Sequence, residues 1–297
     1  MIFAIICIFS FVVQNLCCKE YGRRMPATAY AQLVMVAIAT AIVTAITALM
    51  GGAQMMPPEG FLLAGAFGAF FVLTLSTMTI AMNSGHMGVT LLIQNSSLIV
   101  PVIYGLLVWD DRMTVSKGIG IACIFVMLVL SSGDTAAPTE AEKARWNKKK
   151  WLIFTGLAFL GDSLLAIFQG YMSRACETTS ATVFTFWTSV FSMVIAFAAE
   201  LIMRACGKGD VLFSGKKAGV SFGLCCLGIG VGTAGGNVFT IVALEKLKSS
   251  VLFFPLRSGT LVLVMWLAGI LIYRERITKR GIAMLLTGII GLVLLNI

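Results

Sequence analysis

The sequence predicts an all-α integral membrane protein with ten transmembrane helices arranged as two inverted five-helix repeats. Of the 297 residues, 59% are hydrophobic and only 12% are charged, and the mean hydropathy is +0.96. Soluble domains carry about 25% charged residues. Apolar runs of roughly 17 to 27 residues recur along the chain, which is the helix length that crosses a hydrocarbon core of about 30 Å.

Ten apolar segments have this length, and none shows the alternation of a β-strand. We expect helices near 2–18, 28–50, 60–82, 87–109, 114–132, 151–173, 180–204, 217–243, 249–273 and 278–296. The first segment lacks a basic start and a small-residue cleavage site, so we expect a mature helix rather than a signal peptide. A polar linker, 133–150, separates a first half, 1–132, from a second half, 151–297, with five helices in each.

Short motifs recur in the two halves. Residues 14–19 (QNLCCK) resemble residues 169–174 (QGYMSR), and residues 105–114 (GLLVWDDRMT) resemble residues 269–278 (GILIYRERIT). The recurrence indicates a diverged tandem duplication. Because five helices is an odd number, the second copy must enter the membrane upside down, as in the inverted repeats of many secondary transporters.

Basic residues are distributed unevenly between the loops. Sixteen of the 22 lie in or beside the loops after helices one, three, five, seven and nine, five lie beside the other loops, and Arg257 is within a helix. Because Lys and Arg are enriched in cytoplasmic loops, this bias places both termini outside the cell membrane. Topology thus accounts for the net charge of +9, and we expect the lipid bilayer rather than a nucleic acid as the partner.

The paired motifs resemble those of the drug/metabolite transporter superfamily, specifically its EamA-like ten-helix members. The similar features are an acidic residue that opens a short loop before helices five and ten (Asp111 and Glu275), Gly120 after the first of these, and Pro101 and Pro255 in helices four and nine. The second repeat lacks the corresponding glycine, and many members keep both termini in the cytoplasm. The resemblance implies transport of a small organic metabolite or drug-like compound.

Two charged residues lie deep within apolar segments, Asp162 in helix six and Arg257 in helix nine, the latter roughly 6 Å from mid-helix. A charge at the bilayer centre costs about 3 kcal/mol, so such groups face a cavity or a partner. We interpret Asp162 as a carboxylate that binds substrate or a proton, the alternative being a structural contact. Arg257 is either an anion-binding or gating residue or a structural ion-pair partner. An acid and a base together would fit an amphoteric substrate.

Further candidates are polar or aromatic side chains in helices one, four, six and seven: Gln14, Gln94, Asn95, Ser97, Gln169 and Trp187. The polar ones are expected to line a cavity or to hydrogen-bond between helices. Trp187 fits either an organic ligand or an interfacial aromatic belt.

Helix eight carries glycines at four-residue spacing, Gly228, Gly232 and Gly236, which predict close packing against another helix. The overlapping GxGxxG pattern of residues 230–235 is not expected to bind a nucleotide, because no strand precedes it.

No motif for an enzyme, a metal or a cofactor is present. The eight cysteines show no CxxC or Cys/His spacing, and the single histidine is His86. There is no GxxxxGK[ST], HExxH or GxSxG sequence. We therefore expect a non-enzymatic secondary transporter driven by a proton, another cation or the substrate's own gradient. The alternatives are an intramembrane enzyme and a non-transporting membrane sensor or scaffold.

Overall fold

The molecule is built from helices. The computed structural model describes residues 2–24, 28–84, 90, 93–132, 148–175, 179–207, 209, 216–273 and 278–295. The elements in these ranges are α1 (Ile2–Arg24), α2 (Ala29–Thr47), η1 (Ala48–Gly52), α3 (Pro58–Ser84), η2 (Ser96–Leu98), α5 (Ile99–Val108), α6 (Val115–Ser132), α8 (Lys148–Ala175), α9 (Ala181–Ala205), α10 (Lys216–Leu247), α11 (Ser250–Tyr273) and α12 (Lys279–Leu295). Among the described residues, seven helices are long and apolar enough to cross a membrane. The predicted all-α class is confirmed, and the seven candidate spans are compatible with a multi-pass membrane protein.

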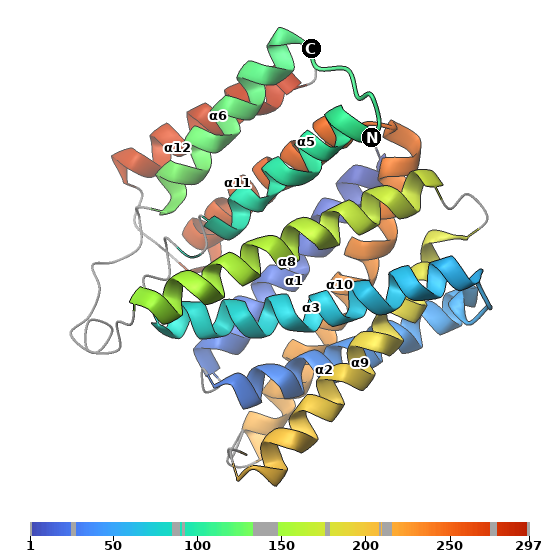
Figure 1. The fold of residues 1–297 in the computed structure, drawn as a ribbon. Coiled ribbons are helices and arrows are strands. Elements are labelled where there is room, and N and C mark those ends of the chain that lie inside the picture. The colour runs from blue at the N-terminus through green and yellow to red at the C-terminus, as the bar shows by residue number, and fades with distance from the viewer. Residues whose placement is uncertain are drawn as a thin grey trace.

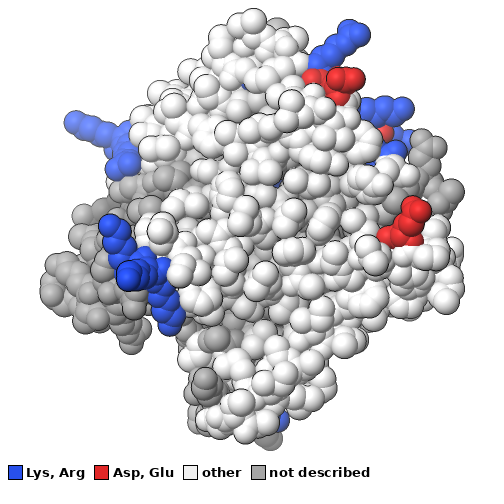
Figure 2. Space-filling model, in the orientation of Figure 1, with Lys and Arg blue, Asp and Glu red and all other residues white. Residues whose placement is uncertain are grey.

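The face of the bundle drawn in Figure 2 has an uncharged middle. The helices pack as a tilted bundle in which the two labelled chain ends lie at the same end (Figure 1). Lys, Arg, Asp and Glu side chains gather toward the edges of the face shown in Figure 2. Large apolar side chains are exposed instead, among them Leu62 (79%), Leu107 (78%) and Leu271 (78%). Apolar exposure on this scale is expected where lipid covers the protein.

Several helix bounds differ from the predicted ones. Helix α1 continues to Arg24 and α10 to Leu247, and α8 begins at Lys148, within the predicted linker. Polar residues extend these ends because long basic side chains can leave the apolar region while the backbone stays helical. The remainder of the linker, 133–147, lies outside the described residues, as do His86 and the motif around Glu275.

The fourth predicted helix, 87–109, is not one continuous α-helix. Within its described part, the 3₁₀ turn η2 interrupts it before α5. Pro101 explains the break, because proline has no N–H and its ring conflicts with the carbonyl four residues earlier, that of Ser97. The predicted helix is present over the described residues 93–108. The 3₁₀ turn within it was not predicted, although the proline was visible in the sequence.

Glycines allow the closest helix contacts. A Cβ atom on Gly232 of α10 would lie 2.6 Å from the carbonyl oxygen of Ser10 in α1. A Cβ atom on Gly120 of α6 would lie 2.9 Å from the carbonyl oxygen of Gly291 in α12. Helix α10 therefore packs directly on the backbone of α1, and α12 on that of α6.

Polar contacts tie α2 to α9 at both of their ends. Trp187, near the start of α9, donates to the carbonyl oxygen of Gln54 after η1 at 2.8 Å. Tyr30, near the start of α2, donates to Glu200 near the end of α9 at 2.8 Å, and Arg204 pairs with the same carboxylate at 2.6 Å. The two helices are therefore antiparallel, and their contacts mark two opposite ends of the molecule.

Candidate functional site

Asp162 lies at the middle of α8 and is half-buried. One of its carboxylate oxygens accepts a hydrogen bond from the Ser97 hydroxyl at 2.5 Å. Ser97 lies in η2, so the 3₁₀ turn in the fourth helix positions the hydroxyl that donates to Asp162. The Ser163 hydroxyl donates to the carbonyl oxygen of Phe159 in its own helix and reaches the carbonyl oxygen of Ser97 at 3.5 Å. Both polar groups of Ser97 therefore face α8.

Arg257 lies in α11 among aromatic rings and is half-buried. Its guanidinium carbon is 5.1 Å from the ring centre of Phe11, 5.4 Å from that of Phe254 and 6.0 Å from that of Phe253. Such cation–π contacts stabilise a charge by about 1 kcal/mol or more where water is excluded. Within the described residues, Arg257 forms no ion pair or hydrogen bond.

The two central charges share one region without bonding to each other. Arg257 is close enough to Asp162 and to Cys7 to act on both electrostatically. A carboxylate can accept about four hydrogen bonds and a guanidinium can donate five. Asp162 has one protein donor, Ser97, and Arg257 has no protein acceptor among the described residues. The arrangement leaves an acidic and a basic group free to bind a polar molecule.

Three glutamine side chains add polar groups, one of them from α8 itself. Gln169 is buried on α8 and donates to the side-chain oxygen of Asn237 on α10 at 3.0 Å. The side-chain oxygens of Gln14 and Gln94 are buried with no hydrogen-bond donor in the described structure. Buried acceptors are normally satisfied, so both mark positions where a ligand or water can donate. Asn95, in contrast, is exposed.

The structure does not bring Trp187 to the central charges. Its ring packs on Phe61, with ring centres 4.7 Å apart, and on Phe186, at 5.2 Å. Together with its hydrogen bond to Gln54, these contacts fix one end of α9. This placement favours the interfacial interpretation over the ligand-binding one.

The glycine stripe of α10 faces α1. Cβ atoms on Gly228, Gly232 and Gly236 would meet Cys17, Ser10 and Phe11, respectively. The ring of Phe11 also lies against Arg257. The stripe therefore sets the position of one of the rings that surround the central arginine.

Sequence reasoning missed some partners in this region. Asn237 holds Gln169, and the Thr240 hydroxyl lies 3.2 Å from the sulfur of Cys7. Both belong to α10, where isolated polar residues in a glycine-rich apolar segment were the available signal. The described residues contain no cluster of three or more His, Cys, Asp or Glu that could hold a metal ion.

Comparison with known proteins supports the fold alone. No family model matches the chain, and no curated protein matches it. A crystal structure of a protein matches 99% of this chain and 94% of its own chain, with a TM-score of 0.74 and 14% sequence identity. The chain therefore shares an overall helical architecture with a solved structure of nearly the same extent.

Proposed function

We propose that the chain is a secondary transporter of the EamA-like drug/metabolite type, which moves a small organic compound across the plasma membrane by alternating access. The observation that carries the proposal is the central pair of charges. Asp162 keeps acceptor positions and Arg257 keeps its donors, on two helices long and apolar enough to cross a membrane. Ionisable residues inside a membrane are typical of substrate and ion pathways.

The positions of the helix ends support ten membrane crossings in two inverted halves. Five crossings per half place the starts of α1 and α8 on opposite faces. The contact of Trp187 with Gln54 and that of Tyr30 with Glu200 lie at opposite ends of the antiparallel pair α2 and α9, as this topology requires. The interruption at η2 beside Asp162 also fits, because transporter sites are often built at broken helices.

The experiment begins with purified protein and a panel of labelled metabolites. A compound that binds the native state raises the melting temperature by mass action. The binders are then tested for uptake into proteoliposomes. We expect uptake by the wild-type protein and none by Asp162→Asn. The amide has no negative charge to neutralise a bound cation, and it cannot take up and release a proton as a carboxylate does.

Asp110→Asn is the matched control. It makes the same chemical change at an exposed carboxylate outside the central region, and it should transport normally. Melting temperatures close to wild type in both variants would show that folding is retained. Wild-type uptake by Asp162→Asn would remove that residue from the mechanism, and the absence of uptake for every binder would argue for a sensor or scaffold.

A further inference from the structure

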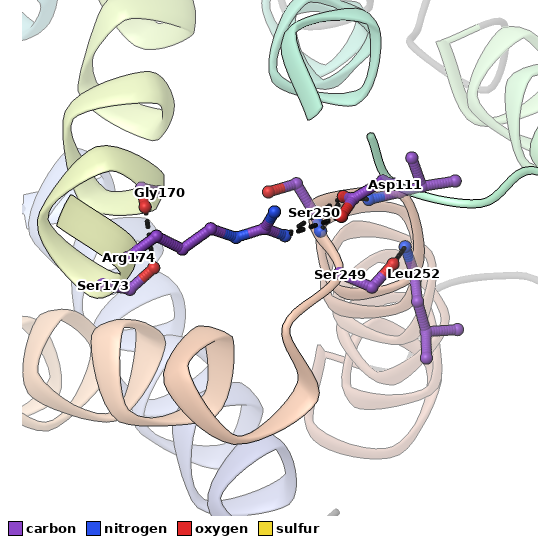
Figure 3. Close-up of polar contacts among 8 residues, drawn as sticks. Asp111, Gly170, Ser173, Arg174, Ser249, Ser250 and Leu252 are labelled. Carbon is purple, nitrogen blue, oxygen red and sulfur yellow. Dashed lines mark hydrogen bonds and ion pairs between the residues drawn. The ribbon is translucent and has the colours of Figure 1, made fainter. Parts of the chain in front are cut away.

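A group of polar contacts, called the junction below, lies near the end of the molecule where α8 ends and α11 begins. Both oxygens of Asp111, in the loop after α5, accept from the Arg174 guanidinium near the end of α8, at 2.9 and 3.1 Å. One of them also accepts from the backbone N–H groups of Ser250 and Val251 at 2.7 and 3.3 Å. Figure 3 shows Arg174 reaching from α8 toward this carboxylate at the start of α11.

The junction is built into the local backbone. Asp111 is buried, with 3% of its side chain exposed, against 12% for Arg174. Gly105 of α5 makes room, because a Cβ there would lie 2.8 Å from a carboxylate oxygen of Asp111 and 3.0 Å from the Cβ of Ser250. The first N–H groups of a helix carry partial positive charge and attract an anion. Asp111 thus links two positive partners on different helices.

Those two helices are the ones that carry the central charges. Arg174 follows Asp162 by twelve residues along α8, or about 18 Å, and Ser250 precedes Arg257 by seven residues along α11, or about 10 Å. Helices α8 and α11 make few direct contacts with each other. At this end, the Asp111 carboxylate is therefore a principal connection between them.

An apolar layer lies between the junction and the central charges. It is a cluster of buried side chains from four helices: Ala4, Cys7, Ala166, Ala243, Leu244, Phe253 and Phe254. Phe253 and Phe254 are essentially unexposed. A molecule approaching Asp162 and Arg257 from this end would have to part both the junction and this layer.

The junction also holds polar groups that are not satisfied. The Trp109 ring lies against Arg174, whose guanidinium carbon is 5.3 Å from the ring centre. The side-chain nitrogen Nε1 of Trp109 and the Nε of Arg174 are buried without an acceptor in the described structure. A permanent structural joint normally satisfies its buried donors. Parting of the junction would let water reach both groups.

We propose that Asp111, Arg174 and the N-terminus of α11 form a gate that closes one end of the pathway. The gate opens when Asp111 releases Arg174 and α11, so that α8 and α11 can separate above the central charges. This inference rests on the proposed transport function, and it assigns a role to the acidic loop motif that the central site does not use.

The test measures access to the centre without needing a substrate. Cys7 is a fully buried member of the apolar layer, and the other seven cysteines are replaced by alanine. The protein is placed in lipid nanodiscs, and the rate of reaction of Cys7 with a charged methanethiosulfonate is followed. Asp111→Asn and Arg174→Gln should each raise that rate about tenfold, because each removes a charge-assisted contact of the closed state.

Asp110→Asn is again the matched control and should label at the unmodified rate. If Asp111→Asn and Arg174→Gln also label at that rate, the junction is structural and the gate is refuted. Melting temperatures separate opening from unfolding, because an unfolded variant would lose its cooperative transition. The labelling rate does not depend on transport, so it tests the gate independently of the proposed function.

A cross-link provides a second test. A Cβ on Gly170 of α8 would lie 3.8 Å from the Ser250 hydroxyl, so Gly170→Cys/Ser250→Cys in a cysteine-free chain can join the two helices. Oxidation should abolish uptake of the compound identified by the binding screen, and reduction should restore it. Unchanged uptake by the fully cross-linked protein would refute the gate. If the reduced protein shows no uptake while Asp111→Asn still raises the labelling rate of Cys7, the proposed transport function is refuted and the gate is not.

Discussion

The central charges are held by different means. Asp162 is held by one hydroxyl, that of Ser97, and Arg257 by the faces of aromatic rings. Neither arrangement neutralises the charge. In an apolar environment this is costly, so the site is expected to gain stability when a molecule supplies the missing counter-charge. The contrast with Asp111 is informative, because that carboxylate is paired with an arginine and capped by two backbone N–H groups.

This difference yields a prediction for the double variant Asp162→Asn/Arg257→Gln. If the two residues formed a structural ion pair, each single change would strand the other charge, and the double change would restore stability. Because no such ion pair is present, we expect the effects on the free energy of unfolding to add within about 0.5 kcal/mol. Uptake should be absent in both single variants and in the double variant. Thermal unfolding and uptake check this, and a double variant more stable than the sum of the two single effects predicts would contradict it.

At the scale of the elements, long apolar segments were predicted well and interruptions were not. The length of α11, for example, follows from a run of apolar residues, and Pro255 does not break it. Pro101 does coincide with a break, beside the polar turn that holds Asp162. A single sequence does not distinguish these prolines, because the outcome depends on which neighbouring groups can hydrogen-bond the freed carbonyl.

Two glycines of α10 give a matched test of helix packing. Gly232→Leu should lower the free energy of unfolding by about 1–3 kcal/mol, because a side chain there would overlap the backbone of α1. Gly223→Leu lies on the same helix, and a Cβ there would meet no atom within 4 Å, so its melting temperature should stay near that of the wild type. Thermal unfolding in detergent measures both. Equal destabilisation would mean that the loss of glycine itself, rather than contact with α1, causes the effect.

At the scale of the whole molecule, the class of fold could be predicted because it depends on composition and segment length, which the sequence states directly. The junction between Asp111 and Arg174 was not predicted, although both residues lie in motifs that recur in the two halves. Their partners come from segments more than sixty residues away. Contacts of this kind depend on how helices assemble in three dimensions, and a single sequence carries no record of it.

The orientation of the molecule is the last prediction. The charge bias places the end with the Asp111 loop outside and the end with the last turn of α9 inside. Two exposed positions mark these ends, Asp110 in that loop and Cys206 after α9. In a chain whose only cysteine is introduced by Asp110→Cys, a membrane-impermeant thiol reagent should label intact cells. In a chain whose only cysteine is Cys206, labelling should require permeabilised cells. The reverse pattern would place both termini in the cytoplasm while preserving ten crossings. Asp111, next to Asp110, pairs with Arg174 near the end of α8, shortly before α9 begins, whereas Cys206 follows the other end of α9. Labelling of both positions in intact cells would therefore contradict the inverted architecture itself.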